Sequence, residues 1–497
     1  MTNKLKSVFR SLPQRLTSDT RGFTLVLVAL VLSALMGLTG LGVETGFWYA
    51  IKRQNQSAAD VAALSGAFEL LAGQSSELTA AATYPDICGL AKRDAARNNF
   101  TFNSFSCPTT TPACTSPSTG KMCANNPPVL GTSAGNNNAV EVILSQQQNT
   151  FFANLFLPNV TIETRAVAAI KKLDTSCILA LAKTGTGITI TGNYSLTMPN
   201  CSIAADSKSP TAIDSVGNGC ITAFTVESVG GYSFTGNSVS PCQSSGYDLT
   251  SGPYFFGPNI ADPYVGTLNH TFLITGIPTK SCSAPTITTT TYTYPATGNC
   301  IIASPSNSIV GNYTINLSAG TTGTEITGGL SFIGNGTINL TPGTYWIADG
   351  SLRLTGNITL ECTNCSPGGA GVTIIFTTTK GSAGTIGTLL PTGNVTITLS
   401  APSSGTYAGL LIVQDTVAGA TYTSGGTVGN AGSTLSGLLY FPSSDLAFVG
   451  NIQTTSNCLV AIASQFSFTG NIGLNSSGCP AIGLTNLPTL NTVALVE

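Results

Sequence analysis

The dipeptide Gly-Asn recurs through the carboxyl-terminal part of this 497-residue sequence, and the recurrence limits the folds open to it. Within residues 174–497 it occurs eleven times, and six of the ten intervals between successive copies lie between 19 and 25 residues. A period near twenty is typical of solenoids, in which each repeat is one coil stacked on the next. Gly, Thr, Ser and Asn dominate this region and no amphipathic helix can be traced in it, so we predict that it is all β.

Three of these dipeptides share one template of alternating apolar positions, for example Leu352-x-Leu354-x-Gly356-Asn357-Ile358-x-Leu360. Every second residue is apolar both before and after the glycine, without a shift at the glycine itself. A two-residue hairpin with Gly-Asn as its loop would put the two apolar rows on opposite faces of the sheet. A bend at the glycine, or a three-residue loop, keeps the rows together. The bend fits a parallel β-helix, which the period favours, and the loop fits a Greek-key sandwich or a meander.

An uncharged apolar run near the start of the chain predicts a membrane-spanning helix. Residues 23–43 carry no formal charge, and at about 1.5 Å per residue a helix of this length crosses the roughly 30 Å hydrocarbon core of a bilayer. Because basic residues are retained on the cytoplasmic side, their bias predicts a cytoplasmic amino terminus, with the bulk of the chain on the other side. Five basic residues precede the run and two follow it closely: Lys4, Lys6, Arg10, Arg15 and Arg21 before it, Lys52 and Arg53 after it.

Three aromatic residues, Phe47, Trp48 and Tyr49, follow the run. Aromatic rings favour the headgroup level, so we expect these three to mark the outer interface of the membrane. A cleaved signal peptide is the alternative, because the first residues are basic. The apolar region of a signal peptide would be shorter than this run, and no small-x-small cleavage site occurs at the end of the run before Glu44. We therefore favour an uncleaved anchor.

The helical pattern continues beyond this interface. Apolar residues at steps of three and four run from Ile51 to Leu71, which predicts that an amphipathic helix extends the membrane helix to about Gly73. Glu44 and Asp60 are candidate assembly residues, because a carboxylate near the membrane face can pair with a partner helix. In the simpler interpretation Glu44 lies at the headgroup level and Asp60 on a solvated helix face, and we favour the simpler one for Asp60.

Four short motifs frame this segment: residues 21–25 (RGFTL), 42–46 (GVETG), 52–56 (KRQNQ) and 58–67 (AADVAALSGA). Together with the apolar run and the aromatic exit, they resemble the amino-terminal module of the TadG-like proteins of the bacterial Flp (tight adherence, Tad) pilus assembly system. The resemblance covers about residues 17–67. It implies an inner-membrane protein with a pilin-like helix that works with other pilin-like subunits. Residues 22–25 are also similar to a type IV prepilin cleavage site, but Leu27 stands where Glu is usual, which agrees with an uncleaved anchor.

Residues 74–173 are predicted to form a small α+β unit, such as pilin-like folds need. The patterns indicate a helix at 89–99, strands at 139–144 and 160–170, and a helix at 146–155 between the strands. A loop rich in Cys, Pro and Thr spans about 103–137. A zinc site in this loop is disfavoured, because no histidine is near and the cysteine spacings lack a Cys-x-x-Cys pair.

Fourteen cysteines, four before residue 174 and ten after it, indicate disulfides in a chain that also has a membrane segment. Buried free thiols are the alternative. Cys362 and Cys365 form a Cys-x-x-Cys that we interpret as a small structural loop, because no helix follows it to lower a thiolate pKa. Three other pairs are separated by about one coil, which predicts staples between neighbouring coils: Cys177 with Cys201, Cys220 with Cys242, and Cys458 with Cys479.

No motif typical of catalysis is evident, and we expect no catalytic residue, cofactor or metal. His270 is the single histidine and lies beside neither a nucleophile nor another ligand, so a structural role is favoured. Parallel β-helices often carry polysaccharide lyases and hydrolases, whose chemistry needs paired carboxylates. Asp206 with Asp214, or Asp248 with Asp262, could meet only through folding. A charged share of 8% and a net charge of -2 argue against nucleic-acid binding.

The sequence thus predicts four segments: a basic cytoplasmic segment (1–22), a transmembrane and continuing helix (23–73), a small exported α+β domain (74–173) and a Gly/Thr/Asn-rich β-repeat domain (174–497). We predict a non-enzymatic, single-pass inner-membrane protein of the Tad/Flp system that exposes a β-rich rod to the periplasm or the surface for assembly or adhesion. An uncharged Thr- and Asn-rich surface suits contact with envelope glycans. The alternatives are a membrane-tethered β-helix enzyme acting on polysaccharides and a secreted adhesin.

Overall fold

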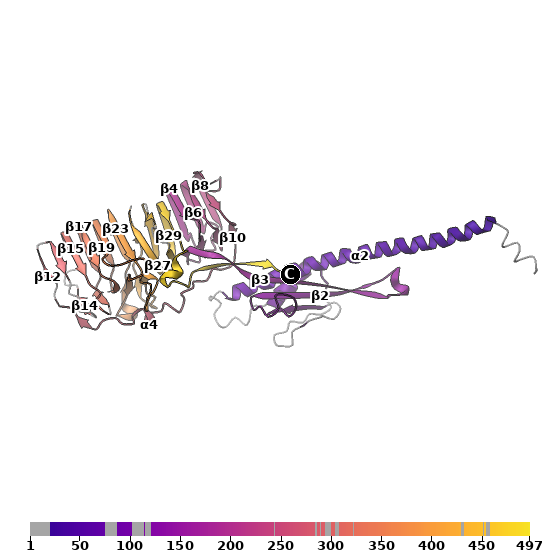
Figure 1. Ribbon diagram of the computed structural model, residues 1–497, viewed down its shortest axis with the longest axis horizontal. Coiled ribbons are helices and arrows are strands. Elements are labelled where there is room, and N and C mark those ends of the chain that lie inside the picture. Colours follow the sequence, from indigo (N-terminus) through magenta and orange to yellow (C-terminus); the bar gives the residue numbers. More distant parts are fainter. Residues whose placement is uncertain are drawn as a thin grey trace, which may run out of the picture. The chain divides into compact units, whose positions relative to one another are not determined.

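A long apolar helix followed by a large, mostly stranded region makes up the chain in the computed structural model, as the sequence predicts (Figure 1). The chain divides into two compact units: Met1–Gln74, Ala80–Lys171 and Val493–Glu497 form the first, and Ser75–Thr79 and Lys172–Thr492 form the second. The structure describes residues 20–74, 87–101, 114, 121–242, 244–283, 286–288, 290–293, 300–303, 308–321, 323–428, 432–450, 452–453 and 458–497.

The first unit packs helices against an antiparallel sheet. Its elements are α2 (Thr20–Gln74), α3 (Ile87–Arg97), β1 (Lys121–Asn125), β2 (Ala139–Asn149), the 3-10 turn η1 (Ala153–Leu155) and β3 (Asn159–Ala180). β2 lies between β1 and β3 and pairs antiparallel with both. The helix predicted at 146–155 is wrong: β2 continues to Asn149, paired with Asn159 of β3, and only η1 is helical.

Small residues bring the second half of α2 close to its neighbours. Ala59, Ala63 and Ala67 are completely buried in a core shared with α3 and the sheet. A Cβ atom at Gly66 would lie 2.9 Å from Cγ1 of Val140 and 3.1 Å from Cγ2 of Ile87, so the helix approaches β2 and α3 too closely for a larger residue. The alanine-rich segment is therefore the core face of the helix.

The second unit consists of parallel strands in successive coils. Among the residues described, the pairings of β4 through β29 are parallel apart from the short antiparallel pair of β12 with β13. β15 pairs with β17 and β17 with β19 in continuous register, with Gly311, Gly334 and Gly356 side by side. A Greek-key sandwich or a meander would pair its strands antiparallel. The parallel arrangement agrees with the stacking that the repeat predicts.

The elements of this region, in chain order, are β4 (Ile188–Met198), β5 (Ser202–Ala205), β6 (Ile213–Ala223), β7 (Val226–Ser228), β8 (Tyr232–Ser238), β9 (Tyr247–Leu249), β10 (Tyr254–Phe255), α4 (His270–Leu273), β11 (Lys280–Ser281), β12 (Thr286–Ile287), β13 (Thr291–Thr293), β14 (Cys300–Ala303), β15 (Ser308–Leu317), β16 (Thr324–Thr327), β17 (Leu330–Leu340), β18 (Gly343–Ala348), β19 (Leu352–Cys362), β20 (Val372–Thr377), η2 (Gly381–Ala383), β21 (Thr385–Ile386), β22 (Leu389–Thr392), β23 (Val395–Ser400), β24 (Leu410–Gln414), β25 (Thr421–Tyr422), β26 (Gly426–Val428), β27 (Thr434–Val449), β28 (Ile452–Gln453), β29 (Leu459–Gly473), η3 (Cys479–Ile482) and β30 (Thr489–Leu495).

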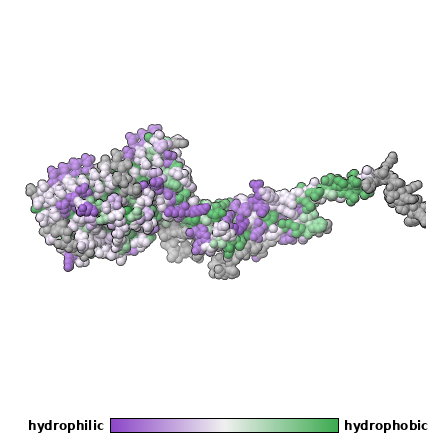
Figure 2. Space-filling view, viewed as in Figure 1, coloured by the Kyte–Doolittle hydropathy of each residue, from purple (hydrophilic) through white to green (hydrophobic). Residues whose placement is uncertain are grey.

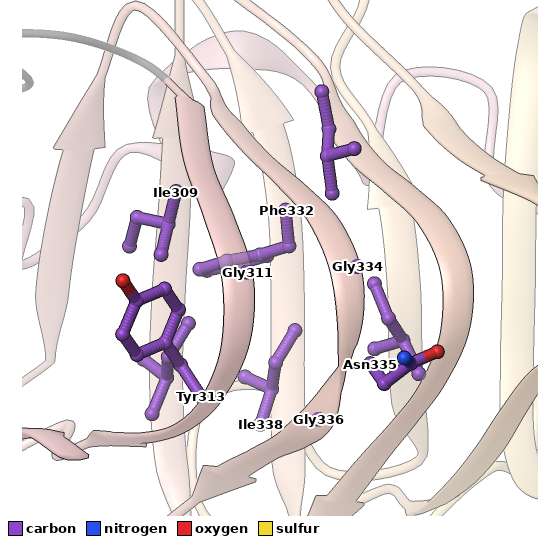
Figure 3. Close-up of a pocket in the computed structure, with 11 residues that line it drawn as sticks. Ile309, Gly311, Tyr313, Phe332, Gly334, Asn335, Gly336 and Ile338 are labelled. Carbon is purple, nitrogen blue, oxygen red and sulfur yellow. The ribbon is translucent and has the colours of Figure 1, made fainter. Parts of the chain in front are cut away.

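The Gly-Asn dipeptides mark bends within strands. Gly334 has a φ of 137°, and a Cβ atom on it would lie 2.0 Å from the carbonyl oxygen of Gly311 on the neighbouring coil. Only glycine satisfies both the backbone conformation and the close approach. Figure 3 shows β15 and β17 curving at these glycines. Because the strand bends and does not turn back, Phe332 and Ile338 on the two arms of β17 are buried in the same core.

The asparagines that follow these glycines form exposed ladders across the coils. The Nδ2 atom of Asn335 donates to Oδ1 of Asn312 at 3.1 Å, and Asn357 and Asn394 continue the series with distances of 2.8 and 3.0 Å. Asn237 and Asn218 form the same contact at 3.0 Å. Repeated amide contacts of this kind stabilise stacked parallel strands.

The coils are not stacked in chain order. β29 pairs in parallel with β27, which precedes it, and also with β4, nearly 280 residues earlier, where Phe466 lies beside Ile188. The chain therefore enters the stack in its interior: β4, β6 and β8 extend to one side of β29, and β27, β23, β19, β17 and β15 to the other (Figure 1). Residues 256–279, including α4, connect the two sets.

Candidate functional site: the membrane helix and its exit

The first half of α2 is covered with exposed apolar side chains on all sides. Leu25, Leu30, Leu38 and Val43 are all more than 60% exposed. The segment Thr24–Gly73 contains a stretch long and apolar enough to cross a membrane. Figure 2 shows this half of the helix as a continuous apolar surface. A helix that is apolar all round requires an apolar environment, which a single pass through a bilayer supplies.

The hydroxyl groups within this apolar half are satisfied by the helix itself. Ser33 donates to the carbonyl of Leu30 at 2.9 Å, and Thr39 donates to that of Leu35 at 2.8 Å. Thr45, near the end of the run, donates to the carbonyl oxygen of Leu41 at 2.9 Å. In hydrocarbon every polar group must find a partner inside the protein, so these contacts suit a membrane setting.

The aromatic residues expected at the interface lie within about two helical turns of Val43, the end of the apolar run. Phe47 and Tyr49 are exposed, and Trp48 is half-buried. Aromatic side chains with a polar tip are suited to this position, directly after the apolar run, because the ring can contact apolar surroundings while the tip contacts water. Their role as interface anchors stays a prediction.

Glu44 does not lie on an exposed face of the helix. Its side chain is 4% exposed, and its carboxylate accepts three backbone hydrogen bonds from the tip of the β2–β3 hairpin. The donors are the N–H groups of Phe151 at 2.6 Å, Phe152 at 3.1 Å and Ala153 at 2.8 Å. Neither interpretation of Glu44 from the sequence included a partner within the chain, because the partner lies 107 residues away. Its role in pairing with another subunit stays a prediction.

Asp60 is half-buried and faces the sheet of its own unit. Its Oδ1 atom accepts from Nε2 of Gln56 at 2.8 Å, and the same Nε2 donates to the carbonyl oxygen of Arg165 at 2.8 Å. Gln56 thus connects the carboxylate to β3. An assembly role for Asp60 stays a prediction as well.

Disulfides join the six cysteines that were named from their spacing, in the same three pairs. The Cα–Cα distances are 5.6 Å for Cys177–Cys201, 5.4 Å for Cys220–Cys242 and 4.7 Å for Cys458–Cys479. Each pair links segments about one coil apart. Further disulfides join Cys114 to Cys123, Cys282 to Cys300 and Cys362 to Cys365. The pairing in the protein isolated from cells stays a prediction that peptide mapping tests.

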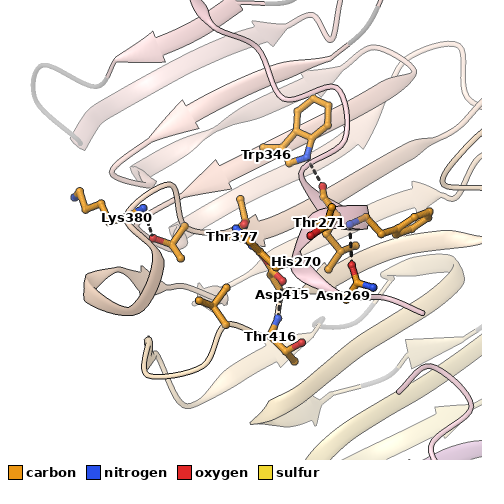
Figure 4. A network of polar contacts seen from close by, with 12 residues as sticks. Asn269, His270, Thr271, Trp346, Thr377, Lys380, Asp415 and Thr416 are labelled. Carbon is orange, nitrogen blue, oxygen red and sulfur yellow. Dashed lines mark hydrogen bonds and ion pairs between the residues drawn. The ribbon is translucent and has the colours of Figure 1, made fainter. Parts of the chain in front are cut away.

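His270 anchors the short helix α4 to the stack of coils. Its Nδ1 atom lies 2.5 Å from Oδ2 of Asp415, a buried carboxylate that also accepts from Oγ1 of Thr377 at 2.6 Å (Figure 4). On the other side of α4, Nε1 of Trp346 donates to the carbonyl oxygen of Leu273 at 2.8 Å. These contacts join the connector to the stack of coils, and a purely structural role for the single histidine stays a prediction.

Two of the aspartates considered for polysaccharide chemistry, Asp206 and Asp262, have the same cation, Lys183, as an electrostatic neighbour. Asp206 is buried and forms an ion pair with Lys183. Asp262 borders a cavity of about 310 Å³ and accepts from the hydroxyl of Tyr440 at 2.9 Å. Burial raises the pKa of Asp262, and its hydrogen bonds from the Tyr264 N–H and the Tyr440 hydroxyl act in the opposite direction. Within the described part of the chain, no group of three or more His, Cys, Asp or Glu side chains is arranged to hold a metal ion.

Taken together, the chain has one apolar helix that is compatible with a single-pass membrane anchor, a helix-and-sheet unit on the second half of that helix, and a large parallel-stranded region. Residues 22–69 match the family model Tad, described as putative Flp pilus-assembly TadE/G-like. The match confirms the resemblance of the amino-terminal module and coincides with α2. No curated protein and no solved structure matches the chain.

Proposed function

We propose that this chain is a single-pass inner-membrane protein of a Tad (Flp) pilus assembly system, which holds a β-rich scaffold on the outer side of the membrane. The observation that carries the proposal is the coincidence of the Tad match at residues 22–69 with the exposed apolar half of α2. The second half of α2 is buried in its own unit, so the first half is the part that other membrane subunits can contact.

The orientation follows from charge and from cysteine chemistry. Five basic residues before the apolar run favour a cytoplasmic amino terminus. Disulfides on the carboxyl-terminal side favour an oxidising compartment for the body of the protein. Protease treatment of spheroplasts tests this directly: the body should be digested from outside, and protection of the body would contradict the orientation.

The role in assembly is tested by exchanging the anchor. Deletion of the gene should abolish piliation, and the wild-type chain should restore it. A chain in which residues 24–39, the exposed part of α2 before Gly40 and Glu44, are replaced by an unrelated apolar sequence of equal length should be inserted but should not restore pili. Normal piliation and surface attachment in the deletion strain would remove the proposed role. Restoration by the exchanged anchor would show that α2 is only a tether.

For the body, a non-enzymatic role in surface contact is supported by the exposed asparagine ladders. Amide groups without formal charge can hydrogen-bond to polar surfaces such as envelope glycans. Purified protein should sediment with isolated cell-envelope polysaccharide, and a chain with Asn335→Ala and Asn357→Ala should sediment less. Equal sedimentation of both would argue against the ladder as the contact surface. Loss of material from the polysaccharide into the soluble fraction would instead indicate an enzyme.

A further inference from the structure

The tip of the β2–β3 hairpin exposes large apolar side chains. Phe151, Phe156 and Leu157 are 79, 87 and 46% exposed, and Phe152 is 59% exposed. Residues 150–158 contain no formal charge, and none occurs between Glu141 and Glu163. Soluble proteins do not usually concentrate large exposed apolar residues on one short turn, and such a patch marks a surface that is covered by something apolar.

At least six of the eight backbone N–H groups of residues 150–157 have an acceptor within the protein. The N–H groups of Phe151, Phe152 and Ala153 donate to Glu44. Those of Phe156 and Leu157 donate to the carbonyl oxygen of Ala153 at 2.9 and 2.8 Å, and that of Thr150 donates to the carbonyl of Pro158 at 3.3 Å. The hydroxyl of Thr150 donates to the carbonyl of Leu157. A turn in hydrocarbon needs this internal pairing, whereas a turn in water does not.

The tip is attached to α2 at the end of the apolar run, through Gly40 inside the run and Glu44 directly after it. The ring of Phe152 lies over Gly40, where a Cβ atom would be 2.5 Å from its Cδ1 atom. Gly40 precedes Val43, the last residue of the uncharged run, by three residues, or about 4.5 Å along the helix axis. Leu38 and Leu41, at the same level, are exposed on the helix surface. Any bilayer that covers these two leucines reaches the hairpin tip as well.

We propose that the β2–β3 tip is a second membrane anchor, inserted among the lipids of the outer leaflet beside α2. The inference rests on the proposed role of α2 as the membrane helix. Lipid is favoured as the occupant because the tip is continuous with the exposed apolar surface of α2, carries no charge and has most of its backbone N–H groups paired within the protein. A single helix is free to rotate about its axis, whereas a helix and an attached hairpin tip together set the orientation of the first unit relative to the membrane.

Depth-dependent fluorescence quenching tests the insertion. The full-length chain carrying Phe156→Trp is reconstituted into vesicles of phosphatidylethanolamine and phosphatidylglycerol that contain acyl chains brominated at defined positions. The signal is the difference from the parent chain, which has Trp48 and Trp346. Leu38→Trp reports on α2 itself. Leu130→Trp is the matched control, because Leu130 lies in the loop before β2, at the end of the hairpin away from the tip.

We expect the added fluorescence in the Phe156→Trp chain to be quenched at least twofold by the brominated lipids, with emission at shorter wavelength than in the Leu130→Trp chain. Quenching in the Leu38→Trp chain without quenching in the Phe156→Trp chain would overturn the inserted tip while leaving the anchor intact. It would also point to another protein as the occupant. If neither is quenched, α2 does not span the bilayer and both proposals fail.

Discussion

Glu227 is a buried carboxyl group whose replacement should make the protein more stable at neutral pH. It lies on β7, between Ala204 of β5 and Tyr254 of β10, and is 3% exposed. Its Oε2 atom has no hydrogen-bond partner among the described residues. Burial raises its pKa from 4.5 to about 8, because the charged form loses its hydration without gaining a compensating contact.

The sign of the effect follows from this raised pKa. Below pH 4.5 the carboxyl group of Glu227 is protonated in both the folded and the unfolded chain, so its titration does not change the free energy of unfolding. Between pH 4.5 and about 8 only the folded chain keeps the proton, so stability falls as the pH rises. At about 1.4 kcal/mol per pH unit, the loss reaches about 3 kcal/mol at pH 7 and levels off near 5 kcal/mol above pH 8.

Glu227→Gln keeps the size of the side chain and removes the titration. The variant should match the wild type near pH 4.5 and exceed it in the free energy of unfolding by about 3 kcal/mol at pH 7. Denaturant unfolding of the full-length chain in detergent, followed by fluorescence of the buried Trp346, measures the difference. Asp248→Asn, at an exposed carboxylate, is the control and should show no such trend. A difference between variant and wild type that does not change from pH 4.5 to pH 8 would refute the reasoning.

Three further predictions concern the bends, the hairpin tip and the disulfides. Gly334→Ala should lower the free energy of unfolding by at least about 3 kcal/mol, whereas Gly192→Ala, also at positive φ but with its nearest neighbour 3.9 Å away, should lower it by about 1–2 kcal/mol. Equal losses by denaturant unfolding would exclude the close approach as the cause. Glu44→Gln should accelerate hydrogen exchange of the backbone N–H groups of residues 151–153 by about tenfold or more, because the glutamine side chain offers these donors a single acceptor oxygen. Unchanged protection would show that the carboxylate does not hold the tip. Replacing both Cys458 and Cys479 by serine should destabilise the second unit by about 3 kcal/mol, as closure of a loop of this length predicts. An unchanged midpoint of unfolding would show that the two cysteines are not bonded in the isolated protein.

The parallel arrangement could be predicted from the sequence because its constraint is local. A Gly-Asn bend is visible within a few residues, since the alternation of apolar positions keeps its parity through the glycine. Gly334 shows the physical reason: its φ of 137° and the carbonyl of Gly311 both exclude a side chain. The need for glycine at each bend makes the bend visible in the sequence. Its recurrence at a nearly constant interval indicates the stacking.

The order of the coils could not be predicted in the same way. Coils that carry the same template offer similar surfaces to one another, so the pattern does not say which coil stacks on which. The contact of β29 with β4 is decided by particular side chains, such as Phe466 and Phe468 beside Ile188 and Ile190. The connector of residues 256–279 carries no repeat, and its path depends on contacts such as that of His270 with Asp415.

The wrong helix at residues 146–155 has a non-local cause as well. Gln146, Gln147 and Gln148 neither alternate in polarity nor exclude a strand, so helix propensity alone decided the prediction. In the structure these residues pair across the hairpin with β3, and the turn after them is held by Glu44. Pairing with β3, between 12 and 16 residues further along the chain, thus overrides a weak local preference for helix.

Gly40 and Glu44 nevertheless show that a local signal for the hairpin contact is present. They are four residues apart, so they lie on one face of α2, one turn from each other. A glycine there leaves space for the ring of Phe152, and the carboxylate one turn later accepts the backbone N–H groups of the same tip. A carboxylate near the end of a membrane helix is costly unless its oxygens are satisfied, and three N–H groups near the boundary of the hydrocarbon are costly unless they have acceptors. Each group removes the cost of the other. Glycine and glutamate at this spacing, at the carboxyl-terminal end of an apolar run, therefore indicate a contact inside the chain before they indicate one with another subunit.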